Sequence, residues 1–209
     1  MTKTLWVVAT LAIAVLSAQP LLAQAPADNM SYFITSENPG NGANFGGIAG
    51  ADNHCQSLAT AVGAGDKTWR AYLSTTDGIN ARDRIGAGPW FNYAGVQVAA
   101  SVAELHSDSN NLTKESGLTE TGVVPNGVGD DPNRHDMLTG TNADGTASAN
   151  TCNNWIGGEG AVATVGHFDR VGGGPAATSW NASHDSRGCT LEQLNASGGG
   201  GYLYCFAID

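Results

Sequence analysis

The sequence predicts a small α+β domain in which a few helices pack on short β-strands and much of the chain forms loops. Three observations lead to this prediction. Apolar residues recur at helical spacing over 52–62, several short segments have the composition of core strands, and 29 of the 209 residues are glycine. That glycine share is about twice the average of globular proteins and indicates many turns. With 41% apolar residues, the chain is long enough to bury a core.

The clearest helix follows a turn rich in glycine and asparagine. Asp52 is the expected N-cap and Gly63 the expected end of this helix. Between them, apolar residues recur at helical spacing, namely Cys55, Leu58, Ala59 and Val62. A second helix is expected within 98–106, with Val102 and Leu105 on its buried side.

Short strands are expected on both sides of these helices. They are Tyr32–Ile34, Thr68–Ser74, a short strand at Trp90–Phe91, 161–168 and 201–208. Alternation within 68–74 places Trp69, Ala71 and Leu73 on the inner face. All four tryptophans after residue 23 are expected in the core, because a small domain has few other large side chains to pack: Trp69, Trp90, Trp155 and Trp180.

The segment from Ser107 to Thr151 consists mostly of Gly, Asn, Asp, Ser and Thr. About 45 residues with so little periodicity exceed the usual loop of a compact domain. The sequence therefore predicts a long loop that is functional or is held in place by disulfides.

Residues 1–23 are expected to be a secretory signal peptide. Lys3 precedes the apolar run Leu5–Leu16, and small residues lead to a cleavage point after Ala23. The run is shorter than the roughly 20 residues that span a membrane. We expect a lead-in segment over 24–45, one domain over 46–209, and a product in the periplasm or outside the cell.

Export changes how the cysteines are interpreted. An even number of cysteines in an oxidising compartment predicts disulfides, and the chain has four: Cys55, Cys152, Cys189 and Cys205. Their spacing alone leaves three pairings open. No CxxC motif occurs, so a redox or zinc-ribbon motif is not expected.

The charge balance excludes several classes of partner. Nine Lys and Arg oppose 19 Asp and Glu, for a net charge of −10. Such a chain does not suit the phosphate backbone of nucleic acids or an anionic membrane surface. We expect no nucleic-acid partner and no membrane insertion.

An ordered set of short motifs carries a family resemblance. The motifs are Gly47–Gln56, Ala61–Gly63, Trp69–Ser74, Ala81–Arg84, Val102–Leu105, Asp131–Arg134, Cys152–Trp155 and Tyr202–Cys205. In this order they resemble the endostatin-like domain, the C-terminal domain of basement-membrane collagens, which has the C-type lectin-like fold. The resemblance covers most of the chain after the signal peptide, with insertions around 140–150 and 157–174.

The resemblance implies a mixed antiparallel sheet with two helices, a long loop region and two nested disulfides. The implied pairs are Cys55 with Cys205 and Cys152 with Cys189. Cross-links of this kind contribute on the order of 3–5 kcal/mol each, which would help a loop-rich chain.

The long loop contains the best candidate for a binding site. Asp130, Asp131, Asn133 and Asp136 offer hard oxygen donors that suit Ca²⁺. Asp131-Pro132-Asn133 is similar to the carboxylate-Pro-Asn triplet of sugar-binding C-type lectins, and Trp180-Asn181 to their Trp-Asn-Asp motif. The ligand-binding residues expected on this basis are Asp131, Asn133, Arg134, His135, Trp180 and Asn181.

This sequence departs from the lectin pattern at two positions. Ala182 stands where the lectin motif has a calcium-binding Asp, and Asp131 is shorter than the usual Glu. The simpler interpretation of the triplet is a proline turn whose Asp and Asn cap the backbone. The zinc site and the heparin binding of endostatin are not expected, because 24–53 contains no histidine and the chain is acidic.

Three histidine–aspartate pairs allow a different interpretation. His135-Asp136, His167-x-Asp169 and His184-Asp185 could form a metal site or supply a general base, and their loops also carry Arg134, Arg170 and Arg187. No HExxH, GxSxG or phosphate-loop motif accompanies these pairs. We therefore predict a binding module and no enzyme, with a glycan or a surface protein as ligand. The alternatives are a protein-interaction or envelope structural module without a small ligand and, third, a metal-dependent hydrolase.

Overall fold

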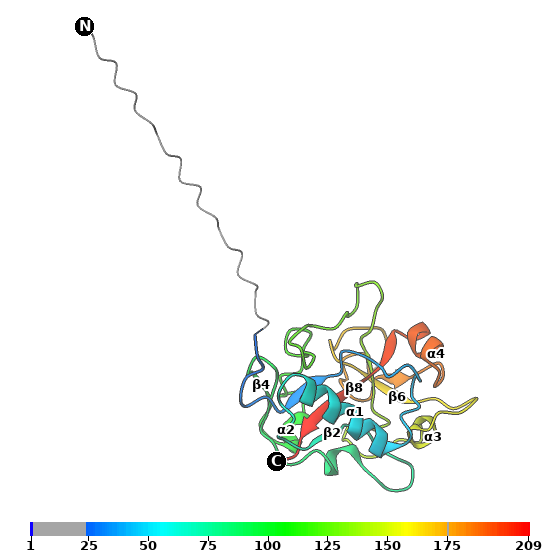
Figure 1. Cartoon of the computed structure of the whole chain (residues 1–209). Helices are drawn as coiled ribbons and strands as arrows, with labels where there is room; N and C mark the ends of the chain where they lie inside the picture. The colour runs from blue at the N-terminus through cyan, green and yellow to red at the C-terminus, as the bar shows by residue number, and fades with distance from the viewer. Residues whose placement is uncertain (2–23, 175) are drawn as a thin grey trace.

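The computed structural model describes Met1, residues 24–174 and residues 176–209 (Figure 1). Apart from Met1, the expected signal peptide lies outside the described residues. Among the described residues, no helix has the length and apolar character needed to cross a membrane.

A long C-terminal strand, β8 (Gly199–Ala207), organises a mixed six-stranded sheet. Its order is β1-β8-β5-β6-β7, and β2 also pairs with β8. The shorter strands are β1 (Tyr32–Ile34), β2 (Trp69–Ala71), β5 (Asp136–Leu138), β6 (Thr164–His167) and β7 (His184–Asp185). The strand β5 runs parallel to β8, and the other pairs are antiparallel. The predicted α+β class with a mixed sheet is confirmed.

The alternation of β8 separates two hydrophobic cores. Leu203 and Cys205 belong to the core beneath α1 (Ile48–Ala61), while Tyr204 and Phe206 face the other core. Figure 1 shows α1 lying across β8 and β2. All four tryptophans expected in the core are at most 3% exposed.

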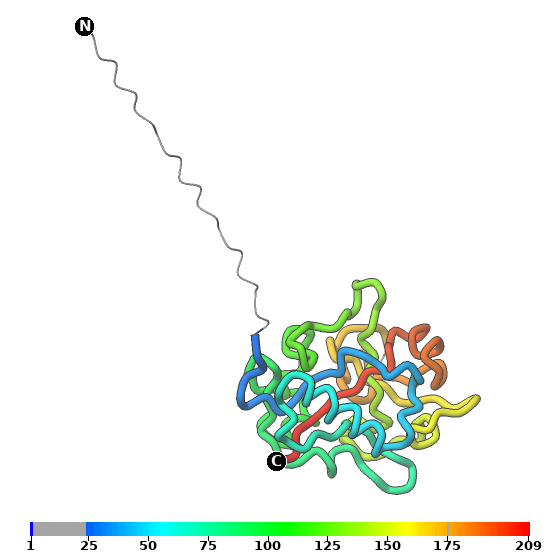
Figure 2. Tube along the Cα trace, viewed as in Figure 1, coloured from blue at the N-terminus to red at the C-terminus, as the bar shows by residue number. Residues whose placement is uncertain are grey.

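Short elements complete the fold. They are η1 (Ala81–Asp83), the hairpin of β3 (Trp90–Phe91) and β4 (Gln97–Ala99), α2 (Val102–Leu105), α3 (Cys152–Trp155) and α4 (Leu191–Ala196). All four residues of α3 have positive φ, so this segment is a left-handed turn. Figure 2 shows the segment 107–135, in green, winding as loops before the chain enters β5.

The start of the first helix was predicted wrongly. The helix begins at Ile48 after Gly47, and Asp52 lies inside it. The Asp52 carboxylate accepts a hydrogen bond from the backbone N–H of Ala71 (2.9 Å) and pairs with Arg84 (2.6 Å). Asp52, a residue type that favours the N-cap, therefore makes tertiary contacts with β2 and Arg84 instead.

Two other expectations need correction. Val98 lies in β4, so the second helix is confined to Val102–Leu105. The long predicted loop also contains β5, which lies between β8 and β6 in the sheet. Three residues are too few for a detectable alternation, and the partners of β5 come from distant parts of the chain.

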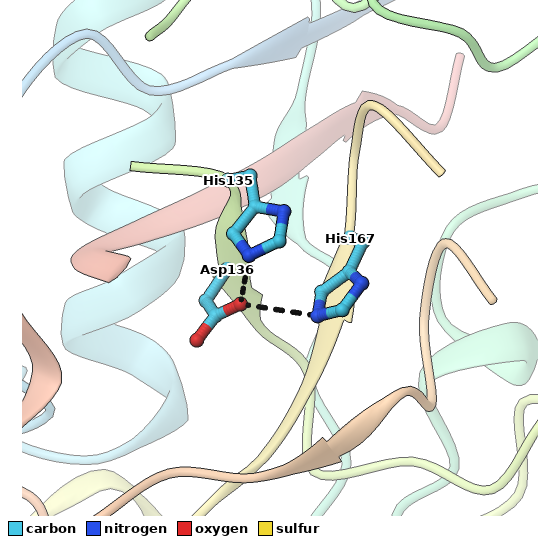
Figure 3. A group of neighbouring side chains, drawn as sticks. All are labelled: His135, Asp136 and His167. Carbon is cyan, nitrogen blue, oxygen red and sulfur yellow. Dashed lines mark ion pairs between the residues drawn. The ribbon is translucent and has the colours of Figure 1, made fainter. Parts of the chain in front are cut away.

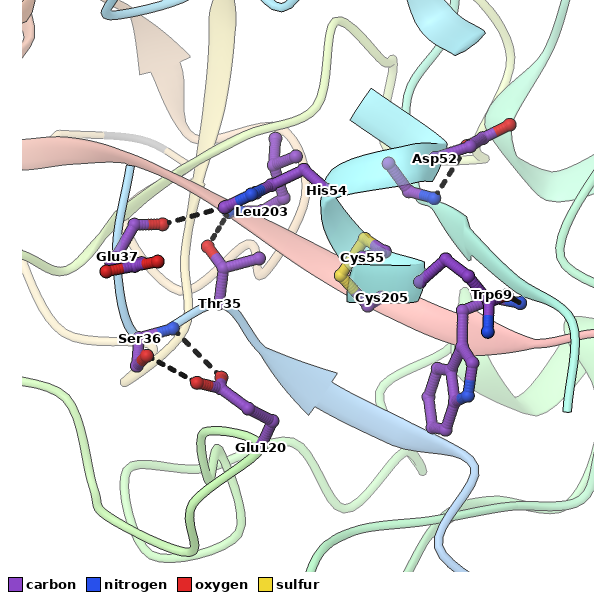
Figure 4. Close-up of a disulfide and its surroundings, with 12 residues drawn as sticks. Thr35, Ser36, Glu37, Asp52, His54, Cys55, Trp69, Glu120, Leu203 and Cys205 are labelled. Carbon is purple, nitrogen blue, oxygen red and sulfur yellow. Dashed lines mark hydrogen bonds between the residues drawn. A yellow bond between two sulfur atoms is a disulfide. The ribbon is translucent and has the colours of Figure 1, made fainter. Parts of the chain in front are cut away.

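The nested disulfide pairing implied by the resemblance is confirmed. Cys55 of α1 is bonded to Cys205 of β8, as Figure 4 shows, and the Cα atoms are 5.7 Å apart. Cys152 is bonded to Cys189, which joins α3 to the turn before α4. The first bridge fixes the helix on the sheet, and the second closes the region that carries β6 and β7.

Candidate metal centre

The register of the sheet brings an aspartate and two histidines together. Asp136 is the direct partner of His167 in the pair β5–β6, and Val165 is the partner of His184 in the pair β6–β7. Since residues two apart on a strand share a face, His184 lies beside His167 on the face that carries Asp136. His135 directly precedes β5.

The three imidazoles converge on one oxygen atom. Asp136 Oδ1 lies 3.2 Å from His135 Nε2, 3.3 Å from His167 Nε2 and 3.4 Å from His184 Nε2. Figure 3 shows the first two approaches. Donor atoms of His135, Asp136 and His167 all lie within 4.8 Å of one another, so this group could bind a metal ion.

Most of the group is withdrawn from solvent. Asp136 and His167 are 2% exposed and His135 is 6% exposed, whereas the side chain of His184 is 38% exposed. Among the described residues, neither carboxylate oxygen of Asp136 nor Nε2 of His167 has an aligned hydrogen-bond partner. Buried polar atoms are rarely left in this state, because the unmade hydrogen bond costs free energy. A cation between these atoms would satisfy them together.

The other nitrogen of each ring is held by an acceptor. Nδ1 of His135 lies 3.1 Å from Asp169 Oδ1, Nδ1 of His167 lies 2.8 Å from the Ala177 carbonyl, and Nδ1 of His184 lies 3.0 Å from the Asp185 carbonyl. These oxygens accept hydrogen bonds, so each Nδ1 carries the proton. A neutral ring then presents the lone pair of Nε2 to the centre, which is the usual arrangement of metal-binding histidines.

The electrostatics of the group favour a positive charge at its centre. Burial alone would raise the pKa of Asp136, but the imidazoles of His167 and His184 outweigh burial and lower it. The carboxylate of Asp136 raises the pKa of His184 to about 9. In metal-free protein at neutral pH the proton on His184 therefore neutralises the carboxylate, and a metal ion would compete with that proton.

Asp169 orients His135 from behind. Burial raises the pKa of Asp169, but its contacts with His135 and with the backbone N–H groups of Val128 and Val171 lower it overall. The same carboxylate accepts hydrogen bonds from Val128 (2.8 Å) and Val171 (3.2 Å). A fixed carboxylate behind a histidine raises the basicity of the ring that would face the metal.

Glycines allow the chain to approach the group closely. A Cβ on Gly198, where φ is +100°, would lie 3.4 Å from His135 Nε2. A Cβ on Gly172 would lie 2.8 Å from a ring carbon of His167. Side chains at these positions would push on the imidazoles.

Of the four residues expected to bind calcium, Asp136 alone belongs to the compact group. Asp130 forms an ion pair with Lys114 (2.7 Å) and accepts a hydrogen bond from the backbone of Gly127. Asp131 is exposed. The side-chain oxygen of Asn133 accepts a hydrogen bond from the backbone N–H of His135, so it helps to position this histidine.

Two predicted ligand residues lie in the interior. Trp180 is 3% exposed and packs on Tyr72, with ring centroids 4.7 Å apart. Asn181 is 1% exposed, and its amide donates hydrogen bonds to the Tyr72 hydroxyl and to the carbonyls of Asn142 and Ala143. In this structure both residues attach loops to the core, and Arg134 donates a hydrogen bond to the carbonyl of Gly199.

The expected ligand set lacked two residues of the centre, His167 and His184, and the supporting residue Asp169. Each belongs to one of the histidine–aspartate pairs, so the signal was visible in the sequence. Spacing along the chain could not show that the three pairs meet, because the register of β5, β6 and β7 brings them together.

The fold and the site define a class of protein: a disulfide-bonded α+β domain with a buried group of histidines and an aspartate that could bind a metal. Comparison of the chain with protein-family models finds no matching family, and comparison with curated proteins finds no matching relative. The resemblance to the endostatin-like domain therefore stays a prediction.

Proposed function

We propose that the protein is an exported binding module that holds a divalent transition-metal ion, with zinc as the first choice. The ligands are His135, Asp136 and His167, and His184 completes the set. One observation carries the proposal: three Nε2 atoms approach a single buried carboxylate oxygen at 3.2–3.4 Å.

The spacing of the donors fits tetrahedral zinc. With metal–ligand bonds of about 2.0–2.1 Å, two ligands of a tetrahedral site are about 3.3 Å apart. The three oxygen–nitrogen distances match this value, and the donor atoms of His135, Asp136 and His167 lie within 4.8 Å of one another. Small shifts of His184, which lies on an exposed two-residue edge strand, would bring its nitrogen into the set.

The chemistry of the donors selects among the metals. Three of the four ligands are imidazole nitrogens, which suit Zn²⁺ and similar ions, whereas Ca²⁺ takes oxygen ligands. The ion pair of Asp130 with Lys114 also occupies one of the carboxylates expected to bind calcium. Zinc is therefore proposed ahead of calcium, which serves as the competing ion in the test.

The wider role follows the sequence predictions. We propose the endostatin-like variant of the C-type lectin-like fold, which the nested disulfides and the packing of α1 on β8 support. Disulfides are consistent with an oxidising compartment such as the periplasm or the cell exterior. Recognition of a glycan or a surface protein is proposed for the long loops, since several residues of the segment 121–134 line a cavity of about 480 Å³.

Metal uptake tests the proposal directly. Protein treated with a chelator is dialysed against Zn²⁺ or Ca²⁺, and bound metal is counted by mass spectrometry. We expect one Zn²⁺ per chain, no retained Ca²⁺, and the visible absorption of a tetrahedral complex when Co²⁺ replaces zinc.

Two substitutions make this test specific. His167→Gln removes a buried ligand and is expected to abolish stoichiometric uptake. His54→Ala, at a half-buried position of α1 outside the metal centre, is the matched control and should bind like the unaltered protein. Equal zinc uptake by His167→Gln and the unaltered protein would place the metal elsewhere and defeat the proposal.

A further inference from the structure

A second candidate site lies beside Arg134, the residue that precedes His135. It is a cavity of about 480 Å³, within the size range of ligand pockets. Its lining includes Arg134, Tyr202, Val123, Val124, Asn126 and Ser36. One part of the cavity lining is apolar, and Arg134 is the one cationic side chain among its other described residues.

Arg134 is held in place but keeps donors free. Its Nη1 donates hydrogen bonds to the carbonyls of Gly199 (3.0 Å) and Asn133 (3.3 Å). Within 24–174 and 176–209, no carboxylate lies within ion-pair distance of its guanidinium, whereas Arg84 pairs with Asp52. A fixed guanidinium with unused donors suits a carboxylate, to which it can donate two parallel hydrogen bonds.

A buried carboxylate between the lining residues Thr119 and Thr121 does not pair with this arginine. Glu120 is 2% exposed and accepts hydrogen bonds from the backbone N–H (3.0 Å) and the hydroxyl of Ser36. Figure 4 shows both contacts, with Glu120 turned toward Ser36. The charge of Arg134 is therefore available to a ligand.

Tyr202 supports the arginine from the sheet. A Cβ on Gly200 would lie 2.8 Å from Arg134 Cδ and 3.1 Å from Tyr202 Cζ. The missing side chain at Gly200 thus lets the stem of the arginine and the tyrosine ring pack closely on β8.

The opposite wall offers apolar surface and free backbone. Val123 is 60% exposed and Val124 is 38% exposed, so these neighbouring side chains offer apolar surface to a ligand in the cavity. The backbone N–H and C=O of Val124 make no hydrogen bond within the described residues. Because Val124 precedes Pro125, extended backbone is favoured there, and such a segment can pair with an extended peptide.

From this arrangement we infer that the cavity binds the C-terminal carboxylate of a polypeptide that ends in an apolar residue. Arg134 pairs with the carboxylate, Val123 and Val124 cover the last side chain, and the backbone of Val124 pairs with the peptide backbone. The inference deepens the proposed role as a binding module, on which it rests, and it makes no use of the metal.

The test compares peptides that differ only in the terminal group. Labelled hexapeptides ending in Val, Leu, Ile or Phe are titrated onto the full protein as free acids and as C-terminal amides, in chelator and in zinc. We expect at least one free acid to bind about tenfold or more tightly than its amide, since the amide cannot accept both hydrogen bonds as an anion. Zinc should not be required.

Variants assign the binding to the cavity. Arg134→Gln should bind the free-acid peptide no more tightly than the amide. Arg134→Lys keeps the positive charge but cannot donate two parallel hydrogen bonds, so its affinity for the free acid should be intermediate. Arg187→Gln is the matched control, an exposed arginine outside the cavity lining. Circular dichroism and zinc uptake show whether each variant is folded.

Each contrary result has a separate meaning. Equal binding of acid and amide, or unchanged binding by Arg134→Gln, overturns the inference. The absence of binding by all eight peptides also overturns it, while zinc uptake by the same sample leaves the metal proposal standing. Binding of neutral glycans in place of peptides would support the lectin-like role and reject a peptide terminus as ligand.

Discussion

Substitution of Asp169 tests whether the histidines are organised as a metal site. Asp169 does not approach the centre itself but holds His135 by the 3.1 Å contact with Nδ1. Loss of such a supporting carboxylate typically weakens metal binding about 10- to 100-fold. Asp169→Asn is therefore expected to reduce the stabilisation by zinc without removing it.

The expected magnitude follows from mass action. At a zinc concentration 100 times the dissociation constant, binding stabilises the unaltered protein by about 2.7 kcal/mol. A 10- to 100-fold weaker site at the same concentration would give about 1.4 to 0.4 kcal/mol. For a chain of this size 1 kcal/mol corresponds to about 2–4 °C, so the zinc-dependent rise in Tm falls from about 5–11 °C to a few degrees or less.

Thermal melts in chelator and in zinc measure this difference. Asp169 also accepts hydrogen bonds from two backbone N–H groups, so Asp169→Asn lowers stability in chelator as well. The comparison of the two conditions isolates the contribution of the metal. Asp209→Asn is the matched control, because this carboxylate accepts hydrogen bonds from the backbone N–H and the hydroxyl of Thr68 and contacts no imidazole of the centre. A full zinc response in Asp169→Asn would refute the reasoning.

Three further predictions concern the stability of the metal-free protein, its disulfides and the packing of its sheet. The pKa of His184 is raised from 6.5 to about 9, so this histidine stabilises the fold fully below pH 6.5 and loses this effect as the pH rises through 9. Urea unfolding in chelator should show the loss of stability, and His184→Gln should remove this pH dependence. Replacement of both Cys55 and Cys205 by Ser opens a loop of 150 residues and should cost about 5 kcal/mol in the same assay. Gly166→Ala would place a Cβ 1.8 Å from the carbonyl oxygen of Trp180 and should destabilise the protein by about 1–3 kcal/mol.

Controls separate these effects from general damage. Cys152 and Cys189 close a loop of 37 residues, so replacement of this pair should cost about 4 kcal/mol, less than the other pair. Gly173→Ala meets no atom within 4 Å and should leave stability unchanged. A rise in metal-free stability between pH 6.5 and 9 that depends on His184 would contradict the assigned contact with Asp136.

The sequence predicted the parts of the fold that depend on local pattern. The strands at Tyr32–Ile34 and near the C-terminus were found because apolar residues cluster there. It missed β5, since a strand of three residues surrounded by polar ones has no period of its own. The start of α1 was also missed, because the side chain of Asp52 is used by β2 and Arg84.

The candidate site likewise contains residues that the local sequence indicates and residues that only the sheet brings together. His135 and Asp136 stood in the predicted site because they are adjacent in a conspicuous polar run. The sequence marks His167 only as one member of a pair with an aspartate. Its role at the centre depends on the antiparallel register Asp136–His167, which a shift of one residue would destroy.

By itself the sequence determined the α+β class, the residues that fill the cores and the residue types available for chemistry, because these follow from composition and local periodicity. Tertiary structure decided which imidazoles meet around Asp136 and that the guanidinium of Arg134 lines a cavity, bonded to backbone carbonyls. Both depend on how segments far apart in the chain come together. Residues 136 and 167 become neighbours only when β5 and β6 pair within the sheet that β8 organises. No pattern within either segment encodes that distance.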